Sequence, residues 1–258
     1  MTLVWLDDLR LNAELSGPAN APPLVLIHGL GLDHRLWDAL LPHLRTRTLR
    51  LDLRGHGDSD TPAPPYAMGT LIRDVERLMT HFAFKDAVVL GAGEGGLIAQ
   101  GLAAKRLDLV RAMVLTGSAT RFANPAVWET RLARLRDKGP DLDAECAQIL
   151  GPRWQASSAL APTRAMLDLT RPEGWQGLAA ASATADFYQT TATLKLPTLI
   201  LAGADDRKTP PDLQRELADL VAGSQFQLLR GGSYLSMLTH PDAFAEALFG
   251  FLTRIGHS

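Results

Sequence analysis

The sequence contains few of the features that mark secreted, membrane or nucleic-acid-binding proteins. Cys146 is the only cysteine, so no disulfide can form within the chain and a cytoplasmic location is expected. No apolar run approaches the ~18 residues of a membrane-spanning helix, and we expect no secretion signal. With 26 basic and 28 acidic residues, the formal charge of −2 is too small to attract nucleic acid or anionic lipid. The expected partner is therefore a small molecule.

Apolar residues are abundant and occur in short runs that alternate with amphipathic segments. They make up 46% of the 258 residues, enough for a large core. Apolar runs predict strands at residues 3–6, 9–15, 24–27, 48–51, 87–90, 111–115, 196–202 and 225–229. Helical spacing predicts helices at residues 36–44, 69–84, 95–104, 211–221 and 241–255. This alternation predicts an α/β fold with a mostly parallel central sheet and helices on both faces.

The alternation stops between residues 120 and 193. Gly139-Pro140, Gly151-Pro152 and Arg171-Pro172 divide this segment into short helices. An insertion at the carboxyl ends of parallel strands lies over the ligand crevice. We therefore predict a core of residues 1–119 and 194–258, with residues 120–193 inserted as a helical lid.

A glycine-rich turn between a strand and a helix, at residues 91–96, raises two alternatives. Gly91-x-Gly93-x-x-Gly96 fits a dinucleotide-binding fingerprint, although the next strand ends in Thr116 rather than in an acid. The same turn fits a nucleophile elbow, which lifts one side chain above the sheet. The nucleophile position is then Gly93, which has no side chain to attack with.

Several motifs make the chain resemble the α/β-hydrolase family. They are His28-Gly29, D-L-R-G-H-G-D-S at residues 52–59, the elbow, G-A-D-D-R-K-T-P-P at 203–211 and G-G-S-Y-L-S-M-L-T-H-P at 231–241. In the lid, R-P-E-G-W at 171–175 followed by Ala185-Asp186 is most similar to the 3-oxoadipate enol-lactonase group, which hydrolyses small carboxylated lactones. The resemblance implies an α/β-hydrolase fold without a cofactor.

The resemblance also implies which catalytic residues the chain keeps. Asp206 matches the acid of the triad, whereas Gly93 stands in place of the serine and Tyr234 in place of the histidine. An enzyme that has lost a central triad member accelerates the reaction only about 10³- to 10⁴-fold over the rate in water, so ordinary serine hydrolysis is not expected. The backbone N–H groups of Leu30 and Glu94 are expected to remain as an oxyanion hole.

Glu94 is the residue expected to carry any surviving chemistry, because the side chain after the nucleophile position faces the ligand in relatives. It is a candidate general base or nucleophile. The helix N-terminus favours the anion by about 0.3 to 1 kcal/mol, whereas burial under an apolar lid raises a carboxyl pKa by several units, so we expect a raised pKa if the lid closes. The alternative is that Glu94 caps its helix or pairs with a lid arginine.

The remaining candidates supply binding groups. Tyr234 is a donor to an oxyanion or a partner for Asp206. No spacing such as H-x-x-x-H occurs near Asp206, so no metal is predicted. The candidate substrate-binding residues are His28, also expected as a turn residue, with Trp128, Trp154 and Trp175. The candidates for holding a substrate carboxylate are Arg121, Arg131, Arg134 and Arg164.

Three hypotheses follow for function. The leading one is an enzyme that acts on a small lactone, ester or other carbonyl compound by acid/base or other non-serine chemistry at Glu94. The second is a catalytically inactive relative that binds a small ligand or a protein partner. The third, a remote alternative, is a dinucleotide-binding protein that uses the glycine-rich turn.

Overall fold

A single eight-stranded sheet organises the structure, a computed structural model that describes residues 2–154 and 157–257. The strand order is β1-β2-β4-β3-β5-β6-β7-β8, with antiparallel pairing from β1 to β4 and parallel pairing from β4 onward. The strands are β1 (Thr2–Leu6), β2 (Leu9–Ser16), β3 (Pro23–Ile27), β4 (Arg47–Leu51), β5 (Ala87–Ala92), β6 (Val110–Thr116), β7 (Thr198–Gly203) and β8 (Gln225–Leu229). The predicted mostly parallel α/β fold is confirmed.

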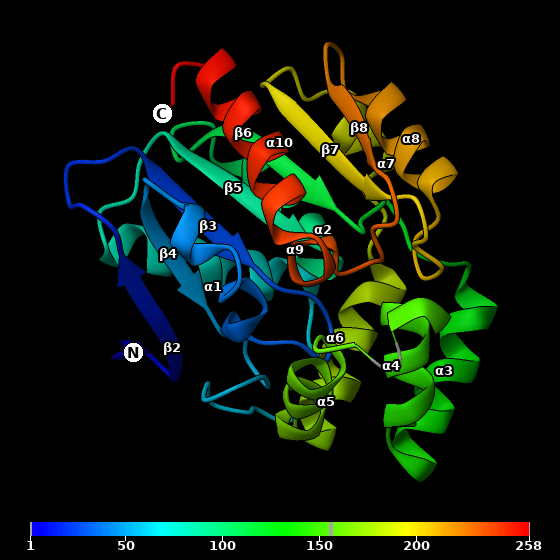
Figure 1. Cartoon of the computed structure of the whole chain (residues 1–258). Helices are drawn as coiled ribbons and strands as arrows, with labels where there is room; N and C mark the ends of the chain where they lie inside the picture. The colour runs from blue at the N-terminus through cyan, green and yellow to red at the C-terminus, as the bar shows by residue number, and fades with distance from the viewer. Residues whose placement is uncertain (1, 155–156, 258) are drawn as a thin grey trace.

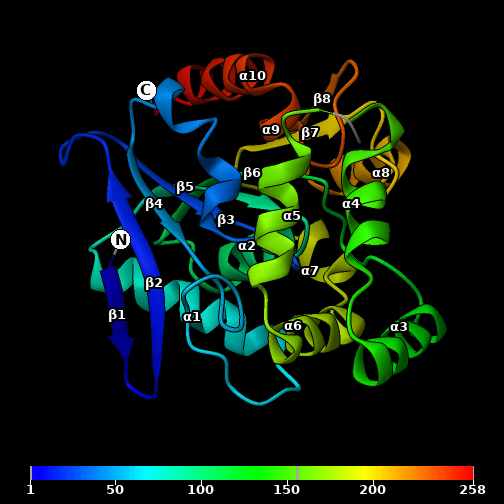
Figure 2. The ribbon, with the colours of Figure 1, turned by 60° about the horizontal axis from the view of Figure 1, so that its bottom comes forward.

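Helices cover both faces of the sheet, so its central strands are buried on both sides. Figure 2 shows α1 (Met68–His81) and α2 (Glu94–Lys105) on one face and α10 (Pro241–Arg254) on the other. Accordingly, every residue of β5 and β7 is buried. The remaining α-helices are α3 (Pro125–Lys138), α4 (Leu142–Leu150), α5 (Leu160–Leu169), α6 (Pro172–Thr184), α7 (Tyr188–Ala192), α8 (Pro211–Leu220) and α9 (Ser236–Thr239).

The helix predicted at residues 36–44 is wrong. The segment forms two short 3₁₀ helices, η1 (His34–Trp37) and η2 (Leu41–His43); a third, η3 (Pro152–Trp154), follows α4. Pro42 lacks a backbone N–H and its ring clashes with the preceding turn of an α-helix, so one continuous helix cannot form there. None of the helices within the described ranges has the length and apolar character needed to cross a bilayer.

The strand order determines where a ligand can bind. After β3 the chain adds β4 on one side, and it then crosses to place β5 on the other side of β3. A parallel sheet opens a crevice at such a reversal, outside the carboxyl ends of the two strands. Gly29 and Leu30 follow β3, and Gly93 and Glu94 follow β5. Figure 1 shows helices α3 to α6 gathered beyond the arrowheads of the strands, at this end of the sheet.

A contact between two glycines joins α6 to the loop after β4. A Cβ on Gly174 would stand 1.9 Å from the carbonyl oxygen of Gly55, and a Cβ on Gly55 would stand 2.5 Å from the Cα of Gly174. Only glycine at both positions allows the two backbones to approach this closely.

We predict that Gly174→Ala lowers the free energy of unfolding by about 1 to 3 kcal/mol, because the added methyl group meets rigid backbone. The control is Gly69→Ala in α1, where a Cβ meets nothing within 4 Å. It should leave stability unchanged or raise it by up to about 1 kcal/mol. Urea unfolding measures both, and equal effects of the two substitutions would contradict the described contact.

Candidate functional site

The carboxylate of Glu94 occupies the place expected for a substrate oxygen. The backbone N–H of Leu30 donates to Oε2 of Glu94 at 2.8 Å, and the backbone N–H of Glu94 itself also stabilises the carboxylate. The Glu94 side chain is only 1% exposed. The N–H groups of Leu30 and Glu94, expected to form an oxyanion hole, both act on this carboxylate, so a side chain of the protein already accepts from the Leu30 donor.

The electrostatic surroundings of Glu94 also differ from the expectation. Burial acts to raise the pKa of the Glu94 carboxyl, but Lys208 and the backbone donor of Leu30 outweigh burial and lower the pKa below its ordinary value. The predicted rise in pKa is wrong because the sequence did not reveal Lys208 as a neighbour. At neutral pH Glu94 is an anion.

Gly93 and Tyr234 fit together at the elbow. Gly93 has φ 56° and ψ −122°, a conformation that strains residues with a side chain. A Cβ on Gly93 would stand 1.9 Å from Oη of Tyr234, and Cβ atoms on Gly29 and Gly117 would stand 3.1 and 2.7 Å from atoms of the same phenol. The tyrosine therefore fills the space that a nucleophile side chain would need.

The hydroxyl of Tyr234 is an unused hydrogen-bond donor. Tyr234 is 1% exposed, and Oη has no hydrogen-bond partner among the described residues. Burial raises the pKa of the phenol well above its ordinary value, and the charge of Glu94 adds to this effect, so the hydroxyl keeps its proton. Of the two predicted roles, partnership with Asp206 is wrong, and donation to a substrate stays a prediction.

Asp206 has a different partner, Gln214, which the sequence analysis missed. Oδ1 of Asp206 accepts from the backbone N–H groups of Lys208 and Thr209 at 2.9 and 2.8 Å, and Oδ2 accepts from Nε2 of Gln214 at 3.1 Å. Burial nevertheless raises the pKa of Asp206 to about 7. The only sequence signal for this contact is a glutamine in the first turn of the helix that follows Asp206.

A cavity of 160 Å³ lies beside Glu94, between the core and the inserted helices. Its walls include Glu94 and Lys208 from the core and Phe122, Trp128, Arg131 and Gln148 from residues 120–193. A larger hollow of 420 Å³ runs along residues 150–153 and 204–207, but Glu94 does not line it. We therefore take the smaller cavity as the candidate site.

Two cations border this cavity. Nζ of Lys208 is buried without a hydrogen-bond partner among the described residues, and it lies 4.6 Å from the centre of the Tyr234 ring. The guanidinium of Arg131 pairs with Glu145 at 2.9 Å and stacks over Trp128 at 5.4 Å. Lys208 lies two residues after Asp206 in the motif at 203–211, a position that the sequence analysis did not single out.

The other predicted binding residues lie elsewhere. Nδ1 of His28 lies 2.8 Å from the carbonyl oxygen of Gly29, and Nε2 accepts from Leu53 N–H at 2.9 Å, so both ring nitrogens are used within the fold and substrate binding by His28 is corrected. Trp175 is buried against Gly31, away from the cavity. The side chain of Trp154 lies outside the described residues. The remaining predicted arginines pair with exposed aspartates: Arg121, Arg134 and Arg164.

Close packing accounts for the glycine-rich turn without a dinucleotide. A Cβ on Gly91 would stand 2.4 Å from the carbonyl oxygen of Gly95, and one on Gly96 would stand 2.2 Å from Oγ of Ser118. The N-terminus of α2, where a pyrophosphate binds in that fingerprint, already faces the anionic Glu94. The Glu94 carboxylate would repel a pyrophosphate at this point, which argues against the dinucleotide alternative.

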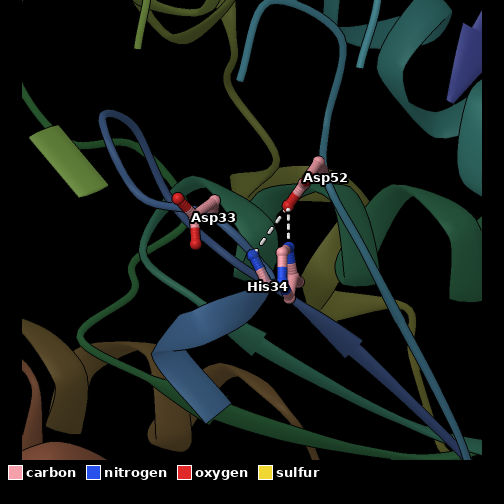
Figure 3. A group of neighbouring side chains, drawn as sticks. All are labelled: Asp33, His34 and Asp52. Carbon is pink, nitrogen blue, oxygen red and sulfur yellow. Dashed lines mark hydrogen bonds and ion pairs between the residues drawn. The ribbon is translucent and has the colours of Figure 1, made fainter. Parts of the chain in front are cut away.

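Among the described residues, one group of three side chains has the spacing of metal ligands. The ligand atoms of Asp33, His34 and Asp52 lie within 4.8 Å of one another. Figure 3 shows Asp52 joined to His34 by two dashed lines, which are contacts of 2.8 Å to its backbone N–H and to Nδ1. Asp33 instead binds Arg35, with a shortest contact of 2.6 Å. These partners hold the loops after β3 and β4 together.

Comparison with known proteins identifies relatives over nearly the whole chain. The model of the alpha/beta hydrolase family matches residues 24–247. The 3-oxoadipate enol-lactonase 2 of Acinetobacter baylyi is 26% identical over 96% of this chain and 95% of its own. A pimeloyl-[acyl-carrier protein] methyl ester esterase of Klebsiella pneumoniae is 31% identical over 90% and 94%. The crystal structure of the enol-lactonase from Burkholderia xenovorans LB400 superposes with a TM-score of 0.93 at 30% identity, covering 98% and 100%.

We predict that Gly93→Ser lowers the free energy of unfolding by about 1 to 3 kcal/mol, because the side chain meets Oη of Tyr234 in a strained conformation. Tyr234→Phe removes a buried hydroxyl without a described partner and should not destabilise the fold. The double variant should recover part of the loss, because the next atom, Cζ, lies 3.1 Å from the added Cβ. Urea unfolding of the four proteins measures the coupling, and strictly additive effects would refute the steric conflict.

The raised pKa of Asp206 predicts a pH-dependent stability. Between its ordinary pKa of 3.8 and its folded value of about 7, the folded state binds more protons than the unfolded state. The stabilising contribution of this group is therefore complete below that window and is lost as pH rises through about 7. Urea unfolding at several pH values should show wild type losing stability relative to Asp206→Asn across the window. A difference independent of pH would contradict the assignment.

Proposed function

The chain belongs to the alpha/beta hydrolase family, and on this basis we propose that it hydrolyses a small ester or lactone with Glu94, rather than a serine, as catalytic base. The observation that carries the proposal is the ionised carboxylate of Glu94, fixed by the Leu30 N–H at the wall of a cavity. Relatives named 3-oxoadipate enol-lactonase suggest a lactone of that class as substrate.

In the proposed reaction, Glu94 takes a proton from a water molecule whose oxygen attacks the substrate carbonyl carbon. The hydroxyl of Tyr234, which keeps its proton, donates to the oxyanion that develops. The bond between the carbonyl carbon and the leaving oxygen then breaks, and the proton on Glu94 passes to that oxygen. A positioned base contributes typically 10² to 10⁴ in rate, so we expect a slower enzyme than one with an intact triad.

We also propose that residues 120–193 act as a lid. Trp128, Arg131 and Gln148 from this segment face Glu94 and Lys208 from the core across the cavity. Movement of α3 and α4 away from the core would therefore open the cavity to substrate. The cytoplasmic location stays a prediction from the cysteine content.

A second candidate function is binding without turnover, and the filled elbow favours it. Tyr234 occupies the space of the nucleophile. The Glu94 carboxylate accepts the hydrogen bond from the Leu30 N–H, the donor that a serine hydrolase offers to its substrate. Such a protein would hold a small ligand in the cavity and release it unchanged. It would bind saturably, and the ligand would raise its melting temperature.

We expect Glu94→Gln to lower kcat/KM for 3-oxoadipate enol-lactone by about 10² to 10⁴, since glutamine keeps the hydrogen bond from Leu30 but cannot accept a proton. The control is Glu246→Gln, which changes an exposed glutamate of α10. Loss of the absorbance of the enol-lactone measures the rate. Full activity in Glu94→Gln would contradict the proposal. Saturable binding of the enol-lactone with no turnover by wild type would establish the second candidate.

A further inference from the structure

We propose that Lys208 is the residue that binds the carboxylate of the substrate, and that it thereby sets the preference for carboxylated substrates. The inference deepens the proposed function, whose lactone substrate carries such a carboxylate, and it rests on that function in taking the cavity beside Glu94 as the ligand site. Two unused donors of the cavity wall, the charges around them and the size of the cavity carry it.

The first observation is the ammonium group of Lys208. It is buried at the wall of the cavity and has no hydrogen-bond partner in the described part of the chain, although an ammonium carries three donors. Its described neighbours are the face of the Tyr234 ring and the carboxyl groups of Glu94 and Asp206, on which its charge acts. Buried polar groups without partners are costly, so the cavity favours a ligand that accepts from Nζ.

A second donor of the cavity wall is also without a hydrogen-bond partner among the described residues. It is Nε1 of Trp128, a residue that is almost fully buried. One carboxylate would satisfy both Lys208 and Trp128. The structure thus offers two donors to one acceptor group of the ligand.

The charges of the cavity wall favour Lys208 as the anchor. Glu94 repels a second carboxylate, whereas Lys208 and Arg131 attract one. Arg131 is already paired with Glu145, which leaves Lys208 as the principal anchor. A carboxylate bound there leaves Glu94 for the reacting carbonyl, as the proposed hydrolysis requires.

The size of the cavity limits the ligand to a compact molecule. Its 160 Å³ is close to the volume of about 150 Å³ in which an engineered protein cavity binds benzene. A short oxo acid or a small carboxylated lactone matches this volume. Larger acyl chains would require the lid segment to move.

The test is isothermal titration calorimetry with acetoacetate and with acetylacetone, a neutral dicarbonyl of nearly the same size. Lys208→Met should weaken acetoacetate binding about tenfold or more, because it removes a charged hydrogen bond. Lys208→Arg should retain most of the binding. The matched control, Lys195→Met, changes an exposed lysine and should bind as wild type does. Acetylacetone should bind wild type and Lys208→Met equally.

Equal affinity of wild type and Lys208→Met for acetoacetate, or no binding of acetoacetate by wild type, would overturn the inference. Lys208→Gln serves as the second uncharged variant if thermal unfolding shows that the methionine variant does not fold. Binding needs no turnover, so the two proposals fail separately. Glu94→Gln can abolish hydrolysis and still bind acetoacetate through Lys208, which would support both proposals. If Lys208→Met binds acetoacetate as wild type does, the Lys208 proposal fails, although hydrolysis by wild type would still support Glu94 as the base.

Discussion

The hydroxyl of Tyr234 and any side chain at position 93 compete for one space, and the rest of the site depends on how that conflict is resolved. Glycine at position 93 leaves the space empty and adopts the elbow conformation without strain. The phenol then enters from the loop before α9 and fills the space. Gly93 and Tyr234 are therefore coupled, since the tyrosine requires the glycine.

The neighbouring groups have partners that fit this arrangement. Asp206 accepts hydrogen bonds from Gln214 and two backbone N–H groups. The Leu30 donor stabilises the Glu94 carboxylate, and Lys208 supplies the compensating positive charge. The site is thus built around a buried carboxylate and a buried ammonium group beside the elbow.

The sequence predicted the sheet, the position of the elbow and the identities of Gly93, Glu94, Asp206 and Tyr234 as the residues to examine. These predictions rest on local patterns: apolar runs, glycine spacing and short motifs. The errors concern contacts between segments distant in the sequence. The Glu94 pKa was predicted in the wrong direction because Lys208 lies more than a hundred residues away in the chain. Gln214 was missed because the sequence does not distinguish a buried glutamine on a helix from an exposed one.

Packing detail explains the other differences. His28 was retained as a binding residue because it follows a strand at the ligand end of the sheet, but both of its ring nitrogens hold the loops there. Trp128 reaches the cavity and Trp175 does not, although both lie in residues 120–193. The direction of each side chain depends on how its helix packs on the core, which short sequence motifs do not encode.

The central claim is that Glu94 is a fixed, ionised carboxylate stabilised by the nearby charge of Lys208. The most direct test is a carbon-13 NMR titration of the Glu94 carboxyl in wild type and in Lys208→Met. The account predicts that the carboxyl titrates below its ordinary value of 4.5 in wild type and that its pKa rises when the ammonium is removed. A wild-type carboxyl that titrates at or above its ordinary value, with no response to Lys208→Met, would contradict the account.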